Sequence, residues 1–165
     1  MCNFVLVLLA FIFSSLSACQ SSGNNHNANP NNKSSYTWEL IESGQHCAIE
    51  TPKQVLINTQ EDFNALWNET FIGIDPQPTQ PQINFTQTSV IAAYAGEQRS
   101  GGHALSIQSI SPDANNNATI AIQRQKPAAN CMTAAVISYP FLMATVSPKV
   151  DKASFSVTTK EMPCN

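Results

Sequence analysis

Apolar and polar residues alternate in short runs along most of this chain, which is the pattern of β-strands. Residues 89–110 show this pattern as two apolar runs, on which the predicted fold depends most. Both faces of the first run are mostly apolar, which predicts a strand buried on both sides. The glycine pair Gly101-Gly102 separates this run from a second one and predicts a hairpin turn between them. Further strands are predicted from Trp38, at Ala48-Ile49, and at residues 55–57, 118–126, 133–138, 141–146 and 155–159.

One stretch has helical spacing instead. Phe63, Leu66 and Trp67 follow the i, i+3, i+4 pattern of a helix with one buried face. Thr59 is a good N-cap for this helix, and Asp62 follows at its third position. A proline-rich surface connection is expected over residues 74–81. With about eight strands and one short helix, the predicted class is mainly β, as an antiparallel β-sandwich or a partly open barrel.

The first residues indicate where the protein is sent. Residues 4–13 form an unbroken apolar run, and residues 16–19 have the lipobox sequence Leu-Ser-Ala-Cys. An apolar run of this length is typical of a signal peptide and is too short to span a bilayer as a helix. Residues 1–18 are therefore predicted to be a lipoprotein signal peptide, with Cys19 as the lipidated residue. The expected localisation is the cell envelope, and Gln20 after the cysteine favours the outer membrane if the envelope is Gram-negative.

The next segment differs sharply in composition. Residues 20–35 are rich in Asn and Ser and have almost nothing apolar to bury, which predicts a disordered tether. Residues 19–35 are thus the lipidated cysteine and its tether, and residues 36–165 are a single domain. Two fatty chains on one cysteine would give a stable membrane anchor.

Three cysteines remain after removal of the signal peptide and lipidation of Cys19: Cys47, Cys131 and Cys164. Disulfides persist in the envelope, so one bridge and one spare thiol are expected. The predicted pair is Cys131 with Cys164, which would pin the last strand and leave Cys47 free. Cys47 with Cys164 is the alternative.

A family resemblance centres on the predicted turn. Residues 96–103, G-E-Q-R-S-G-G-H, resemble the G-x-R-x-T-G-G-Y turn of the PrcB C-terminal domain family, named after a lipoprotein subunit of a bacterial surface protease complex. Residues 59–67, 83–85 and 139–141 resemble flanking features of that family, so the resemblance extends from about Trp38 to the C-terminus. Ser100 and His103 depart from the threonine and the aromatic residue of the family pattern. The resemblance implies a non-catalytic lipoprotein that docks on another envelope protein.

The sequence offers few catalytic or ligand-binding motifs. Cys47 with His103 as its base would be a thiol nucleophile, but a structural or spare thiol is the favoured interpretation. The three histidines are too scattered to nominate a metal site. A net charge of −3 with eight basic residues argues against nucleic-acid binding. We therefore expect no enzyme activity, no cofactor, no metal and no nucleic-acid partner.

The remaining candidate is a recognition loop. The predicted turn would display an anion, a cation, a hydroxyl group and an imidazole at one rigid tip, and such loops commonly carry binding. The expected function is to bind and stabilise or assemble a partner protein, for which a surface protease is one candidate. The alternatives are a small β-domain protease inhibitor presenting this loop, or a purely structural envelope protein. The predicted partner-binding residues are Glu97, Arg99, Ser100, Gly101, Gly102 and His103.

Overall fold

The computed structural model describes residues 36–113 and 117–164. The predicted signal peptide, Cys19 and the tether lie outside these residues and stay predictions. Among the described residues, no helix has both the length and the apolar character needed to cross a membrane.

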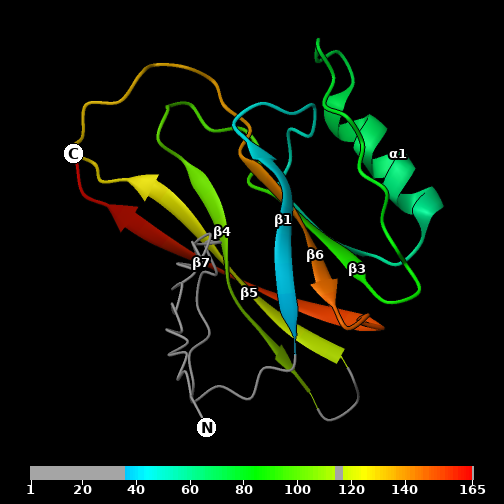
Figure 1. The fold of residues 1–165 in the computed structure, drawn as a ribbon. Coiled ribbons are helices and arrows are strands. Elements are labelled where there is room, and N and C mark those ends of the chain that lie inside the picture. The colour runs from blue at the N-terminus through cyan, green and yellow to red at the C-terminus, as the bar shows by residue number, and fades with distance from the viewer. Residues whose placement is uncertain (1–35, 114–116, 165) are drawn as a thin grey trace, which may run out of the picture. The chain divides into compact units, whose positions relative to one another are not determined.

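The described fold is built from two β-sheets and one helix (Figure 1). The first sheet has the strand order β1-β6-β3-β2, with every neighbouring pair antiparallel. The second has the order β4-β5-β7, where β4 and β5 are antiparallel and β5 and β7 are parallel. The predicted mainly β class is confirmed, and the described residues form no closed barrel. The elements are β1 (Thr37–Gly44), β2 (Lys53–Ile57), α1 (Gln60–Phe71), β3 (Ser89–Tyr94), β4 (Ala104–Pro112), β5 (Asn117–Pro127), β6 (Phe141–Ser147) and β7 (Lys152–Met162).

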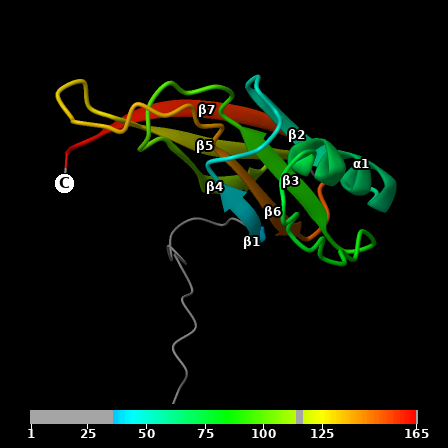
Figure 2. The same ribbon diagram turned by 90° about the horizontal axis from the view of Figure 1, so that it is seen from above.

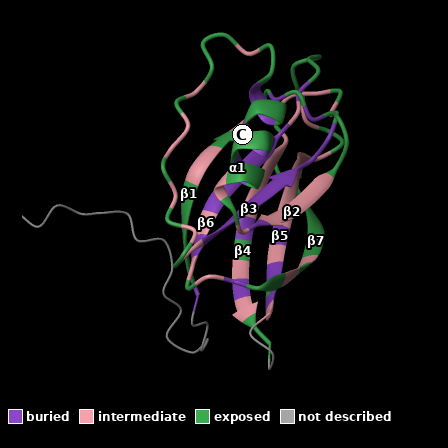
Figure 3. Ribbon diagram, turned by 90° about the vertical axis from the view of Figure 1, so that its right-hand side faces the viewer, coloured by how far each residue is buried: buried purple, intermediate pink, exposed green. Residues whose placement is uncertain are grey.

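Strand β3 lies between two apolar layers, as its sequence predicts. All six of its residues are buried. Ile91 and Ala93 contribute to the core between the two sheets. Val90, Ala92 and Tyr94 contribute to a second core beneath α1. A strand with apolar residues on both faces is stable only where both faces are covered, which explains its central place in the sheet. Figure 3 shows the buried residues along β3 and β6.

Helix α1 covers the outer face of the four-stranded sheet (Figure 2). The Thr59 hydroxyl accepts a hydrogen bond from the Asp62 amide at 3.1 Å, so the predicted N-cap is confirmed. Phe63, Leu66 and Trp67 are buried, also as predicted. Burying three large side chains against a sheet stabilises a helix too short to persist alone.

The expected hairpin between β3 and β4 is wrong. Strand β3 pairs with β2 and β6, whereas β4 pairs with β5 in the other sheet. Residues 95–103 therefore cross from one sheet to the other. Gly96 and Gly102 form two separate bends, one near each end of this crossover. Their positive φ angles are 73° and 85°. Strand β3 is central in its sheet, and β2 and β6 already occupy its two pairing edges. Strand β4 therefore cannot pair with it.

Two expected strands are also wrong. Ala48-Ile49 and residues 133–138 are irregular. Only Ser138 of the second segment joins a ladder, as an isolated bridge to Gln98. The other predicted strands are present, including β7 at an edge, and residues 74–81 form the expected irregular connection. The structure thus has seven strands in its described part instead of about eight.

Candidate functional site

The crossover formed by residues 95–103 is held by backbone hydrogen bonds. Gln98 and Ser138 exchange two of these bonds, at 2.8 and 2.9 Å, and the Gly101 amide donates to the Ala134 carbonyl at 3.0 Å. The crossover therefore lies along residues 134–138, a segment far away in the sequence. These bonds fix the backbone from which the predicted binding side chains extend.

The six predicted binding residues are brought together as two polar pairs around two glycines. The Arg99 guanidinium lies 3.3 Å from the Glu97 carboxylate, and the arginine side chain is 90% exposed. Such an exposed ion pair contributes little stability and leaves Arg99 accessible. The Ser100 hydroxyl and His103 Nε2 are 3.1 Å apart. The tip thus has the anion, cation, hydroxyl and imidazole expected from the sequence, on a crossover instead of a hairpin.

The His103 imidazole is held in its neutral form. Burial lowers its pKa, and the charges of Arg124 and Lys126 lower the pKa further. Its Nδ1 atom is buried without a hydrogen-bond partner among the described residues. Arg124 reaches across from β5 and donates from Nη2 to the Ala95 carbonyl at 3.3 Å. The imidazole therefore adds polarity and shape to this surface but no charge near pH 7.

A small cavity of about 250 Å³ opens beside the tip. Ser100, His103 and Lys126 line it, together with residues 127–129, Cys131 and Thr133. Lys126 is already paired with Glu161 at 2.9 Å. A serine hydrolase needs a third group that orients its imidazole, and within the described ranges no partner contacts His103 Nδ1. The Ser100–His103 pair therefore lacks this third group among the described residues.

Residues 128–138 form an exposed apolar loop beside the tip, which was not predicted from the sequence. Met132 is 102% exposed, Val136 47% and Ile137 56%. A Cβ atom on Gly101 would lie 3.8 Å from Val136 Cγ2, so the two segments are in direct contact. The signal that could have revealed this loop is the complete lack of charged residues from Pro127 to Pro148. The β-like pattern of residues 133–138 led instead to the prediction of a strand.

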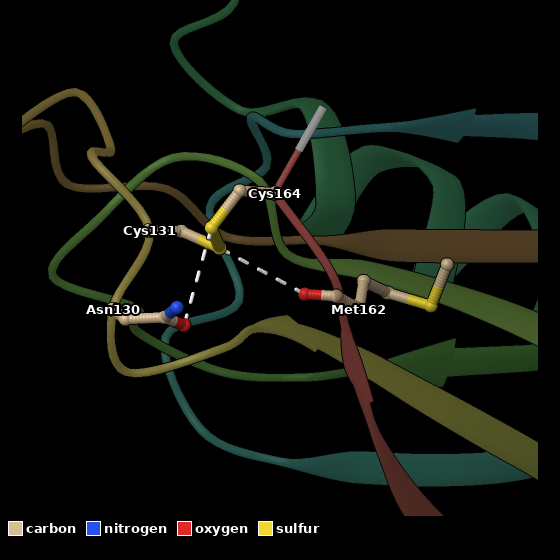
Figure 4. Close-up of a disulfide and its surroundings, with 4 residues drawn as sticks. All are labelled: Asn130, Cys131, Met162 and Cys164. Carbon is tan, nitrogen blue, oxygen red and sulfur yellow. Dashed lines mark hydrogen bonds between the residues drawn. A yellow bond between two sulfur atoms is a disulfide. The ribbon is translucent and has the colours of Figure 1, made fainter.

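The disulfide between Cys131 and Cys164 fixes one end of this loop (Figure 4). The predicted pairing is confirmed. Beside the bridge, the Ala128 amide donates to the Met162 carbonyl at 3.0 Å. The loop is therefore attached both to the end of β7 and to the crossover, although it has no strand of its own.

The predicted free thiol is also confirmed, since Cys47 is unpaired and buried. Its sulfur lies 3.4 Å from the Tyr139 carbonyl and 3.7 Å from the Ile49 carbonyl. Burial raises the pKa of the thiol, which disfavours the nucleophilic thiolate. His103 contacts Ser100 instead, so the structure does not bring the thiol and imidazole together as a catalytic pair.

A second and larger cavity, about 370 Å³, lies between β1 and the proline-rich connection. Glu39 and Glu42 line it along β1, and Trp67 contributes from the helix. None of the predicted binding residues belongs to it. Within residues 36–113 and 117–164, no group of three or more His, Cys, Asp or Glu side chains comes together as metal ligands.

The comparison with protein families assigns the segment that contains the tip. The family model described as PrcB C-terminal matches residues 89–147. These residues are a PrcB C-terminal domain. The matched segment begins with β3 and ends with β6, so the whole crossover and the exposed loop lie inside it. The match is narrower than the expected span from Trp38 to the C-terminus, because β1, α1 and β7 lie outside it. Neither curated proteins nor solved structures gave a match.

Proposed function

We propose that this PrcB-like chain is a non-catalytic, lipid-anchored protein of the cell envelope that binds a partner protein and stabilises or assembles it. A surface protease is the partner class implied by the family resemblance. The proposed contact surface consists of the crossover, residues 95–103, and the loop, residues 128–138. We call it the docking end.

The observation that carries this proposal is the composition of the docking end. Exposed apolar side chains lie beside an accessible arginine, and both are held on backbone that is pinned by hydrogen bonds and a disulfide. Apolar anchors next to an arginine are typical of protein–protein contacts. Because the backbone is already fixed, little conformational entropy is lost on binding.

The docking end lies away from residue 36, the point where the predicted tether joins the domain. Thr37 pairs with Ser147, whereas Gly44 pairs with Phe141 at the other end of the same two strands. Tyr94, just before the crossover, also pairs with Phe141. The docking end is therefore at the opposite end of the sheet from the point where the tether joins (Figure 1). The attachment point at residue 36 therefore leaves this end of the sheet unobstructed.

The proposal that this protein is not a catalyst rests on one pair of groups and one thiol. The Ser100–His103 pair has no carboxylate behind its imidazole among the described residues. The Cys47 thiol is buried with a raised pKa. The docking end consequently offers contacts and no activated nucleophile.

The test is quantitative affinity capture from native membranes with matched variants. Wild type should retain one abundant neighbour, and combining Arg99→Ala with Met132→Ser should reduce that neighbour roughly tenfold or more, as loss of interface anchors does. Ile72→Ser is the control, because Ile72 is an apolar residue with 72% exposure at the C-terminal end of α1 and does not belong to the docking end. Equal capture by the wild type and both variants would contradict the proposal. Loss of protease activity on adding the purified protein would indicate an inhibitor instead.

A further inference from the structure

The larger cavity, of about 370 Å³, follows β1 and has no role in the proposed function. Four consecutive residues of β1, 39–42, line one side of it, and Thr79 with residues 81–83 lines the other. Ile41 and Ile83 give the two sides apolar walls. Concave sites with apolar walls and a few polar groups are typical of ligand binding. We call this site the β1 cavity.

A β-bulge in β1 brings two carboxylates to the β1 cavity. Residues three apart on a regular strand point to opposite faces of a sheet. The register of β1 shifts between Leu40 and Glu42. Glu39 pairs with Thr145 of β6, and Glu42, after the shift, pairs two residues along with Met143. Met143 belongs to the core beneath α1. The bulge therefore places both glutamates on the face that α1 covers, where both line the cavity.

The negative charge of these two glutamates is not neutralised by the described part of the chain. Its ion pairs use the carboxylates of Glu69, Glu97 and Glu161 and not those of Glu39 or Glu42. No lysine, arginine or histidine of the described ranges lines the cavity. A cationic group is therefore the ligand that complements its charge.

Trp67 supplies a hydrogen-bond donor to the same cavity. Its side chain is packed between Phe63 and Phe71, and the residue is only 2% exposed. Its indole Nε1 donates to no described residue, and the atom is not itself buried. Since Trp67 lines the cavity and is covered elsewhere, this N–H faces the cavity. A tryptophan N–H in a buried residue usually has a partner, so the cavity calls for an acceptor as well as a cation.

We propose that the β1 cavity binds a lysine or arginine side chain from an extended peptide segment of another protein. The cationic head contacts Glu39 and Glu42, and its apolar stem lies against Ile41 and Ile83. The Trp67 N–H donates to a carbonyl of the peptide. A peptide satisfies both requirements at once, because it carries a cation and an acceptor on one chain.

The position of the cavity along β1 favours a peptide over a free amine. Strand β1 is at the edge of its sheet and pairs with β6 alone among the described strands. An extended peptide can hydrogen-bond to the outer edge of such a strand while alternate side chains enter adjacent pockets. The site lies outside the docking end and holds whether or not the docking end binds a partner.

Binding to arrays of immobilised nonapeptides tests this site with the full chain in detergent micelles. Three sets have random flanking residues and a central lysine, norleucine or glutamate. Wild type should bind the lysine set roughly tenfold or more above the other two. The double variant Glu39→Gln, Glu42→Gln should lose this preference. The double variant Glu50→Gln, Glu61→Gln is the control, because it removes the same charge from exposed positions outside the cavity. Thermal unfolding should show that both double variants fold.

The indole signal of Trp67 locates the bound peptide. The chain has two tryptophans, so Trp38→Phe leaves Trp67 as the only indole. Its N–H signal should shift in an NMR titration with the lysine peptide that binds best. Arg99→Ala, which alters the docking end, should leave this shift unchanged, so the two binding proposals can fail separately.

Four results would overturn the proposal. The first is equal binding of the three peptide sets, and the second is a lysine preference that the Glu39→Gln, Glu42→Gln variant retains. The third is a Trp67 signal that does not move while the peptide binds. The fourth is a shift of that signal by spermine at the concentration at which the peptide acts, which would assign the cavity to a free amine.

Discussion

Removing the disulfide gives the sharpest test of how the docking end is held. The double variant Cys131→Ser, Cys164→Ser eliminates a bridge between residues 33 positions apart. Closing a loop of that length in the unfolded chain lowers its entropy and is worth about 3–4 kcal/mol. Cys164 is exposed and Cys131 is half-buried, so lost packing adds little. We expect the double variant to lose about 3–4 kcal/mol of unfolding free energy, or roughly 10–15 °C in melting temperature.

Urea unfolding followed by circular dichroism measures this loss, with peptide mass mapping to verify the bridge. Each single variant should lose nearly as much as the double variant, because breaking either end removes the whole constraint. Two results would refute the reasoning. One is a double variant whose unfolding free energy lies within about 1 kcal/mol of the wild-type value. That result would mean that the bridge does not lower the entropy of the unfolded chain as the loop-closure model requires. The other is a mapped bridge that contains Cys47.

Three further predictions concern single contacts. Thr70→Val should cost about 1–3 kcal/mol in urea unfolding, because it leaves the buried Tyr94 hydroxyl, now 2.7 Å from the Thr70 hydroxyl, without its partner; a variant as stable as wild type would contradict this. Gly102→Ala should destabilise more than Gly73→Ala, because both have positive φ angles but only at Gly102 would a Cβ atom meet another side chain, at 2.9 Å; equal losses in thermal unfolding would show that the close contact is not felt. The pKa of His103 should lie below the usual value of about 6.5. The unfolded chain then takes up this proton first on acidification, so the unfolding free energy should fall as the pH drops below about 6.5 and His103→Gln should reduce that fall. NMR titration of the imidazole checks the direction, and a raised pKa would count against the described burial.

The sequence predicts the individual elements better than their pairing. Thr59, Phe63 and Trp67 carry local signals of capping and periodicity, and the helix forms as those signals indicate. Burial on both faces of β3 is likewise visible in its residues. Whether β3 pairs with β4 or with β6 depends on contacts between distant segments, and two glycines cannot decide it. The crossover therefore looked like a hairpin.

The candidate site shows the same limit. Its six tip residues all lie within positions 97–103, and their two polar pairs are local contacts. The apolar loop beside them is joined to the tip by a hydrogen bond from the Gly101 amide to the Ala134 carbonyl. An alternating run such as residues 133–138 predicts a strand, but it becomes one only where a free strand edge is available. Here the crossover offers a single bridge, at Gln98. The run therefore stays exposed and becomes part of the docking end.

Photocross-linking in intact cells tests the central claim most directly. A photoreactive side chain at Met132 would extend from the docking end, and the same group at Ile72 would extend from the end of α1. The proposal predicts one dominant cross-linked protein from position 132, lost when Arg99→Ala is added, and no such product from position 72. The same product from both positions, or none from position 132, would contradict the proposal that the docking end binds a partner.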